Sequence, residues 1–145
     1  MTTKDTQRAL LEYIYTRLTG DATLKAAMGG TVRLRATWAK PDEEFPYLVQ
    51  RIEFNSTEFW PIRQGTLYLD VWSDSENYNE CLEIRRLIIG LLDEHQFDTA
   101  SNEAVNCKLW LQTDGMIEED ALNIWHYATQ WNLRMYRKAE VTAIG

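Results

Sequence analysis

The stretch that decides the fold is Thr66-Leu-Tyr-Leu-Asp-Val-Trp-Ser73. Its odd-numbered interior positions hold two leucines and a valine, whereas the even-numbered positions hold Tyr68, Asp70 and Trp72. A period of two predicts a β-strand with one apolar face. A helix over about 76–95 follows at once, with Ser73 and Glu76 spaced as a capping box. Its apolar stripe is wide enough to cover a sheet.

The strand period of two and the helical spacing of three to four recur along the rest of the chain. They predict helices over 3–18 and 22–28, the second capped by Asp21. They also predict strands over 32–36, 47–55, 104–112 and 124–137, with a turn or longer excursion over 113–123. This order predicts an α+β fold: a single, mostly antiparallel sheet of about five strands with helices packed on one face. Because the chain has 145 residues, we expect one domain over 1–145.

The charge is distributed unevenly. Residues 67–120 hold three basic and thirteen acidic side chains, a net charge of −10, whereas the whole chain carries −7. An acidic chain without a basic stripe is a poor candidate for specific nucleic-acid binding, which depends on Lys and Arg. The longest apolar run, Leu87–Leu92, is far too short for a membrane span. Two cysteines and no secretion signal favour reduced thiols in a cytoplasmic setting.

Catalytic motifs are absent from the sequence. The alternative that stays open is a small enzyme with a site near His126 and Glu118–Asp120, where carboxylates beside an imidazole could perform acid–base work. His95 follows Asp93 and Glu94 at the expected end of the long helix, where the helix dipole favours a histidine. We therefore expect no catalytic residue, no cofactor and no metal.

Aromatic residues are the more informative feature. Several fall on strand faces opposite the expected helices or in loops, and large bare apolar patches are rare on monomers. We therefore expect an interface with a subunit or partner. The loop from Phe54 to Gly65 is longer than most hairpin loops, and Trp60→Ala or Arg63→Glu should impair assembly while leaving the monomer folded. The candidate interface residues are Trp38, Phe59, Trp60, Arg63, Tyr68, Trp72 and Trp110.

Four stretches, taken in order, resemble the tail-completion or tail-terminator proteins of long-tailed phages and prophages. The first leads from the opening helix through Leu18-Thr-Gly-Asp-Ala-Thr-Leu into Met28-Gly-Gly-Thr-Val-Arg. The second is Phe45-Pro-Tyr-Leu-Val49, and the third is Gly65-Thr-Leu-Tyr-Leu-Asp-Val-Trp-Ser73. The fourth is the helix over 76–92. Together they cover about residues 9–95; the Trp-rich final strand and the acidic segment 114–120 depart from the family pattern.

The resemblance implies a non-enzymatic virion structural protein that assembles in the host cytoplasm. It implies a ring, usually of six copies, that caps the tail tube at the head–tail junction. The implied partners are other copies of the chain, the tail tube protein and the head-completion or connector proteins. A head-completion or tail-tube component is the neighbouring alternative, because fold and function are not tied.

Overall fold

The computed structural model describes residues 6–36, 43–55, 62–100, 104–119 and 124–136. The helices are α1 (Thr6–Thr19), α2 (Ala22–Ala27) and α3 (Asn79–Leu92). The strands are β1 (Leu34–Ala36), β2 (Tyr47–Phe54), β3 (Ile62–Ser73), β4 (His95–Phe97), β5 (Val105–Ile117) and β6 (Trp125–Tyr136). This is the expected α+β class, with six strands in place of about five.

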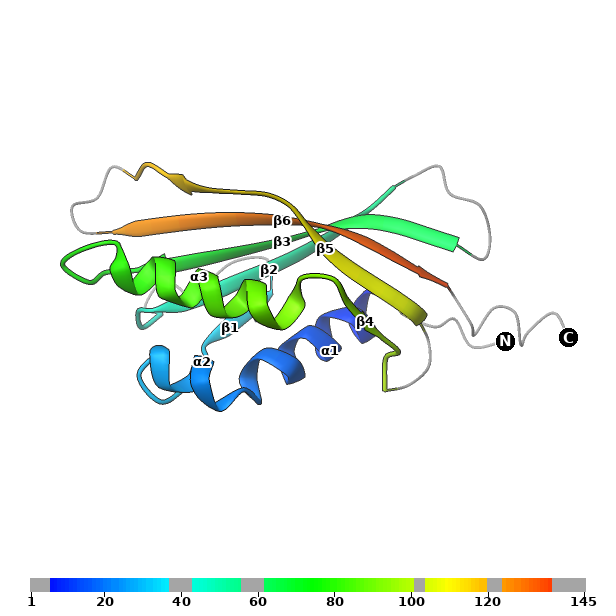
Figure 1. Cartoon of the computed structure of the whole chain (residues 1–145), viewed down its shortest axis with the longest axis horizontal. Coiled ribbons are helices and arrows are strands. Elements are labelled where there is room, and N and C mark those ends of the chain that lie inside the picture. The colour runs from blue at the N-terminus through cyan, green and yellow to red at the C-terminus, as the bar shows by residue number, and fades with distance from the viewer. Residues whose placement is uncertain (1–5, 37–42, 56–61, 101–103, 120–123, 137–145) are drawn as a thin grey trace, which may run out of the picture.

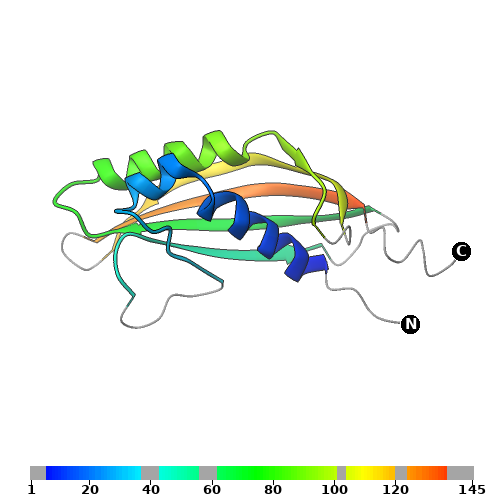
Figure 2. The same cartoon turned by 90° about the horizontal axis from the view of Figure 1, so that it is seen from below.

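The six strands form one sheet in the order β1-β2-β3-β6-β5-β4. β1 runs parallel to β2, and every other pair is antiparallel. All three helices lie on the same side of this sheet (Figure 1), so the predicted one-sided packing is confirmed. Viewed from below, α3 runs along the strands and α1 runs obliquely to them (Figure 2).

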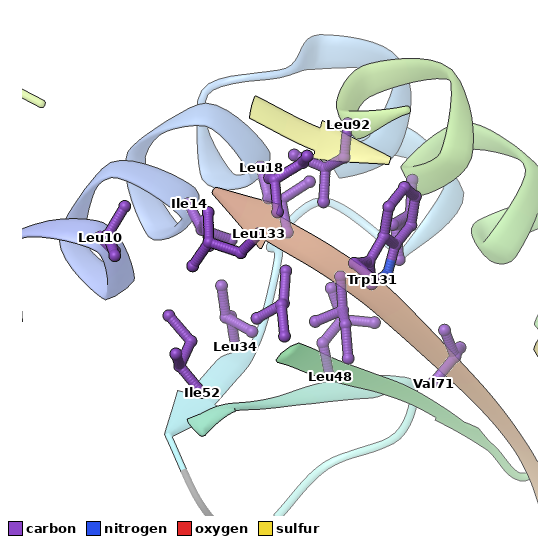
Figure 3. Packing of buried hydrophobic residues seen from close by; sticks show 14 of the residues in the cluster. Leu10, Ile14, Leu18, Leu34, Leu48, Ile52, Val71, Leu92, Trp131 and Leu133 are labelled. Atoms are coloured by element: carbon purple, nitrogen blue, oxygen red, sulfur yellow. The ribbon is translucent and has the colours of Figure 1, made fainter. Parts of the chain in front are cut away.

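The core lies between the helices and the sheet. Figure 3 shows Leu10, Ile14 and Leu18 of α1 on the side of the core that faces β1 and β2. Trp131 of β6 is fully buried and is the largest such side chain among the described residues. Its indole N–H donates to Thr129 Oγ1 at 2.8 Å, and the Thr129 hydroxyl donates to the Leu69 carbonyl at 2.5 Å. The indole nitrogen, the one polar atom of the Trp131 side chain, is therefore buried with a hydrogen-bond partner.

The long helix begins later than the sequence predicts. The predicted capping box of Ser73 and Glu76 is wrong, because α3 begins at Asn79. The Ser73 hydroxyl donates to Glu80 Oε1 at 2.6 Å and accepts from the Ser75 N–H. The hydroxyl is therefore used inside the β3–α3 connection instead of capping residue 76.

The helix also ends earlier than expected, at Leu92. Glu94 has a φ of 57°, and this left-handed residue turns the chain back toward the sheet. His95 then begins β4 and pairs with Leu109 of β5. The prediction of a histidine at the helix C-terminus is therefore wrong.

The boundaries of two strands also differ from the sequence prediction. β5 runs on to Ile117, so Asp114 and Gly115 lie in a strand and not in the predicted turn. The long strand is accommodated by irregular pairing with β6 between Val105 and Lys108 and again between Leu111 and Thr113. β3 begins at Ile62, which shortens the loop predicted over 54–65.

Two neighbouring residues of α3 offer a test of this packing. Ile88 is fully buried, whereas Leu87 is only partly buried. We expect Ile88→Ala to lower the free energy of unfolding by about 2–5 kcal/mol because it leaves a cavity under the helix. The matched variant Leu87→Ala should cost clearly less. Urea denaturation measures both, and equal losses would show that the buried stripe of α3 is assigned wrongly.

Candidate functional site

The face of the sheet opposite the helices is the candidate interaction surface, which we call the open face. In the described part of the chain no helix covers it (Figure 1). Its members alternate with the core residues along each strand and lie opposite one another in the strand register. They include Tyr47, Val49, Arg51 and Glu53 of β2, Thr66, Tyr68, Asp70 and Trp72 of β3, Lys108 and Trp110 of β5, and His126, Ala128, Gln130, Asn132 and Arg134 of β6.

A row of rings crosses one end of the open face. Tyr47, Trp72 and His126 stand directly opposite one another on β2, β3 and β6. The ring centroids of Tyr47 and Trp72 lie 6.0 Å apart, and those of Trp72 and His126 lie 3.8 Å apart, both pairs stacked. Phe45, just before β2, extends the row at 5.1 Å from Tyr47. The stacking joins three strands on the face that the helices leave uncovered.

His126 lies at the end of this row between two carboxylates. Its Nε2 is 2.8 Å from Asp70 Oδ2, and its Nδ1 is 2.7 Å from Glu119 Oε1. Only 10% of the imidazole side chain is exposed. Burial by itself lowers the pKa of His126, but the hydrogen bonds to Asp70 and Glu119 and their negative charges outweigh it and raise that pKa. The arrangement therefore favours the imidazolium, with one N–H for each carboxylate.

This arrangement limits the chemistry that His126 can perform. The structure brings Glu119 to His126, as the enzyme alternative requires, while Asp120 lies outside the described residues. An imidazolium that donates from both nitrogens has no lone pair with which to accept a proton or bind a metal. Within the described ranges, no group of three or more His, Cys, Asp or Glu side chains is arranged to hold a metal ion.

The two cysteine thiols are also poorly suited to act as nucleophiles. Cys81 and Cys107 are free and buried. Burial raises the pKa of Cys81 to about 11 and that of Cys107 to about 12. The nucleophilic thiolate is therefore scarce at neutral pH.

Three of the candidate interface residues share the open face, and each is half-buried. Trp72 belongs to the row of rings. The Arg51 guanidinium lies 4.1 Å from the centroid of the Tyr68 ring. Trp110 stands opposite Asn132 on β6. Trp38, Phe59 and Trp60 lie outside the described residues.

Arg63 is placed differently from the prediction. It lies within β3 and not in the preceding loop, opposite the buried Met135 and therefore on the helix side of the sheet. Its guanidinium lies 3.8 Å from the Phe54 ring centroid and donates to Thr6 Oγ1 at 3.0 Å. Arg63→Glu would thus break contacts inside the chain as well as any contact with a partner.

The sequence reasoning missed three members of this surface: Phe45, Tyr47 and Asp70. The alternation over 66–73 already placed Asp70 beside Trp72 on the face away from the core. What was missing is the register, which sets Tyr47 and His126 on either side of Trp72. Two residues far apart in sequence thus complete the site.

Comparisons with known proteins show a likeness of fold. No protein-family model matches the sequence, and no curated protein matches it significantly. A chain in the solved structure of the virion of a native gene transfer agent particle is similar over 92% of this chain and 99% of its own length, with a TM-score of 0.73 and 14% identity. A second solved chain is similar over 91% of this chain and 96% of its own length, with a TM-score of 0.65 and 10% identity. The likeness extends over nearly the whole of each chain.

One further finding concerns membranes. No helix in the described ranges is long and apolar enough to cross a bilayer.

The His126 cluster predicts a pH dependence of stability. A group whose pKa is raised on folding contributes its full stabilisation below the unfolded value, near 6.5, and loses it as the pH rises through the folded value. We therefore expect wild type to be more stable than His126→Gln at about pH 6, and the difference in unfolding free energy to shrink toward about pH 9. Urea denaturation across this range measures it. A difference that is independent of pH would mean that folding leaves the pKa of His126 unchanged.

Proposed function

We propose that this chain is a structural protein of a phage-like virion: a ring-forming tail terminator that caps the tail tube and docks to head-completion proteins. The observation that carries the proposal is the fold likeness to a chain of a gene transfer agent virion, which spans nearly the full length of both chains. The same coverage supports treating residues 1–145 as one such domain. The order of motifs from Leu18 to Leu92 supports the terminator role within that class.

The open face supports a role in assembly. One end carries stacked aromatic rings, which supply large rigid contact area at low entropic cost. Asp70 and Glu119 make this end acidic, and the negative charges of Glu43 and Glu119 help burial to raise the pKa of Tyr47. Lys108 and Arg134, opposite one another, make the other end basic. A face with one acidic end and one basic end can select one orientation of a partner.

The enzyme alternative is less well supported by the same residues. It needs a proton-exchanging group that a substrate can reach. Only 10% of the His126 side chain is exposed, both ring nitrogens are within hydrogen-bond distance of carboxylates, and the ring is stacked on Trp72. We therefore assign His126 to holding the segment after β5 against the sheet.

Capping of tail tubes tests the function directly. Purified protein added to growing tail tubes should stop their elongation and appear as a ring at one end in electron micrographs. Binding along the tube wall would indicate a tube component, and binding only to heads would indicate a head-completion protein. Either result would overturn the terminator role.

Trp110 on the open face can be tested for its contribution to capping. We expect Trp110→Ala to weaken tail capping at least about tenfold, because an interfacial tryptophan commonly contributes more than about 1.4 kcal/mol. Tyr78→Ala is the matched control, since Tyr78 is 50% exposed at the start of α3, away from the open face. Titration of tube capping by each variant, with circular dichroism to verify folding, measures the effect. Equal capping by both variants would show that Trp110 is not in the contact.

A further inference from the structure

Lys108 of β5 and Arg134 of β6 stand directly opposite one another. Each lies between two buried residues along its strand, so both side chains are on the open face. Like charges in this position repel each other, and neither side chain has an ion pair or a hydrogen bond with another described residue. The positive charge of the pair is therefore not neutralised within the described part of the chain.

This lack of a partner sets Arg134 apart from the other arginines in the described ranges. Six of them form an ion pair with a carboxylate. Of the remaining two, Arg17 donates to the Leu91 carbonyl and Arg63 donates to Thr6 Oγ1. The chain holds 22 acidic and 15 basic residues, so carboxylates are in excess. Two adjacent cations without a carboxylate are therefore a feature that the described fold does not use internally.

The side chains around this pair are rich in hydrogen-bond donors. Gln64 of β3 lies on the other side of Arg134, and Asn132 and Trp110 stand opposite one another in the next row. Their side-chain N–H groups have no hydrogen-bond partner in the described ranges. We call these five residues, Gln64, Lys108, Trp110, Asn132 and Arg134, the donor patch. It brings ammonium, guanidinium, amide and indole N–H groups together without a carboxylate among them.

Carboxylates on either side of the donor patch are already engaged. Glu53 of β2 pairs with Arg51 and accepts from the Tyr68 hydroxyl. Asp98, just after β4, accepts from the Asn106 N–H at 2.9 Å. An acceptor for the donor patch therefore has to come from water or from a bound partner. A carboxylate suits it best, because hydrogen bonds between Lys or Arg and a carboxylate are charge-assisted and strong.

The charge of the chain favours a protein carboxylate over a nucleic-acid phosphate. Binding to nucleic acid depends on many cations that neutralise successive phosphates, whereas the donor patch holds two. The net charge of −7 repels a long polyanion. Trp110 within the patch and Tyr136 in the row beyond Arg134 add apolar contact area for the residues that flank an acidic side chain. A short acidic segment of a protein matches this surface.

We propose that the donor patch docks an acidic segment of a partner protein, with its carboxylates on Lys108 and Arg134 and its flanking residues against Trp110. Asp70 and Glu119 keep the other end of the open face acidic, so the same segment is repelled there and the partner is held in one orientation. The inference rests on the proposed function for the class of partner, a protein of the virion, and adds the chemistry by which that partner is recognised.

A glutamate-rich peptide is the probe for this docking, and a peptide of the same length with glutamine in place of glutamate is its control. The glutamate peptide is titrated into the isotope-labelled full chain. It should shift the NMR signals of the Trp110 indole N–H and of the Gln64 and Asn132 side-chain amides. The glutamine peptide should leave these signals in place, because it brings no negative charge to the two cations.

Charge reversal locates the contact on the chain. Lys108→Glu and Arg134→Glu should each weaken binding of the glutamate peptide at least about tenfold. Lys25→Glu is the matched control, because Lys25 is exposed on α2 and its reversal changes the net charge by the same amount. Circular dichroism verifies folding. Lys108→Gln or Arg134→Gln replaces a reversal that does not fold.

Several outcomes overturn the docking. Absence of binding, or an equal loss of binding in Lys25→Glu, shows that the donor patch is not the contact. Tighter binding of a DNA duplex than of the glutamate peptide at the same salt concentration makes it a phosphate site. Self-association of the wild type in light scattering that Arg134→Glu abolishes makes a second copy the occupant.

Tail capping separates this inference from the proposed function. If the wild type caps tail tubes but the glutamate peptide does not bind at the donor patch, the terminator function stands and the docking fails. If the peptide binds there and both reversals weaken it, but the wild type leaves tail tubes uncapped, the docking stands and the terminator function fails.

Discussion

The burial of Trp131 is the constraint on which the rest of the structure depends. A fully buried indole needs a partner for its N–H, and Thr129 supplies it while donating to the Leu69 carbonyl. Thr129 stands opposite Leu69, so this relay is made only in the observed register of β3 and β6. A slip of one residue would turn Trp131 to solvent and His126 into the core. One buried hydrogen-bond chain therefore fixes the register on which both faces of the sheet depend.

The open face follows from that register. With Trp131 on the helix side, His126 must lie on the other side, level with Trp72 and Tyr47. Asp70, two residues before Trp72, shares this face and reaches His126. The imidazole can be buried there because a carboxylate lies at each nitrogen, and the hydrogen bonds and charges of Asp70 and Glu119 raise the pKa of His126 in spite of desolvation. The cluster connects the open face to the segment after β5.

How much the sequence could predict differs between the fold and the site. Alternation over 66–73 identified β3, and the stripe of the long helix identified its buried face, because both depend on local periodicity. Predictions based on one side chain failed where tertiary partners competed for it. The Ser73 hydroxyl bonds Glu80, and Arg63 contacts Thr6, contacts that no local pattern reveals. The sequence Asp114-Gly115 is typical of a turn, but pairing with β6 keeps these residues extended. The site needs a register between distant strands, which one sequence does not contain.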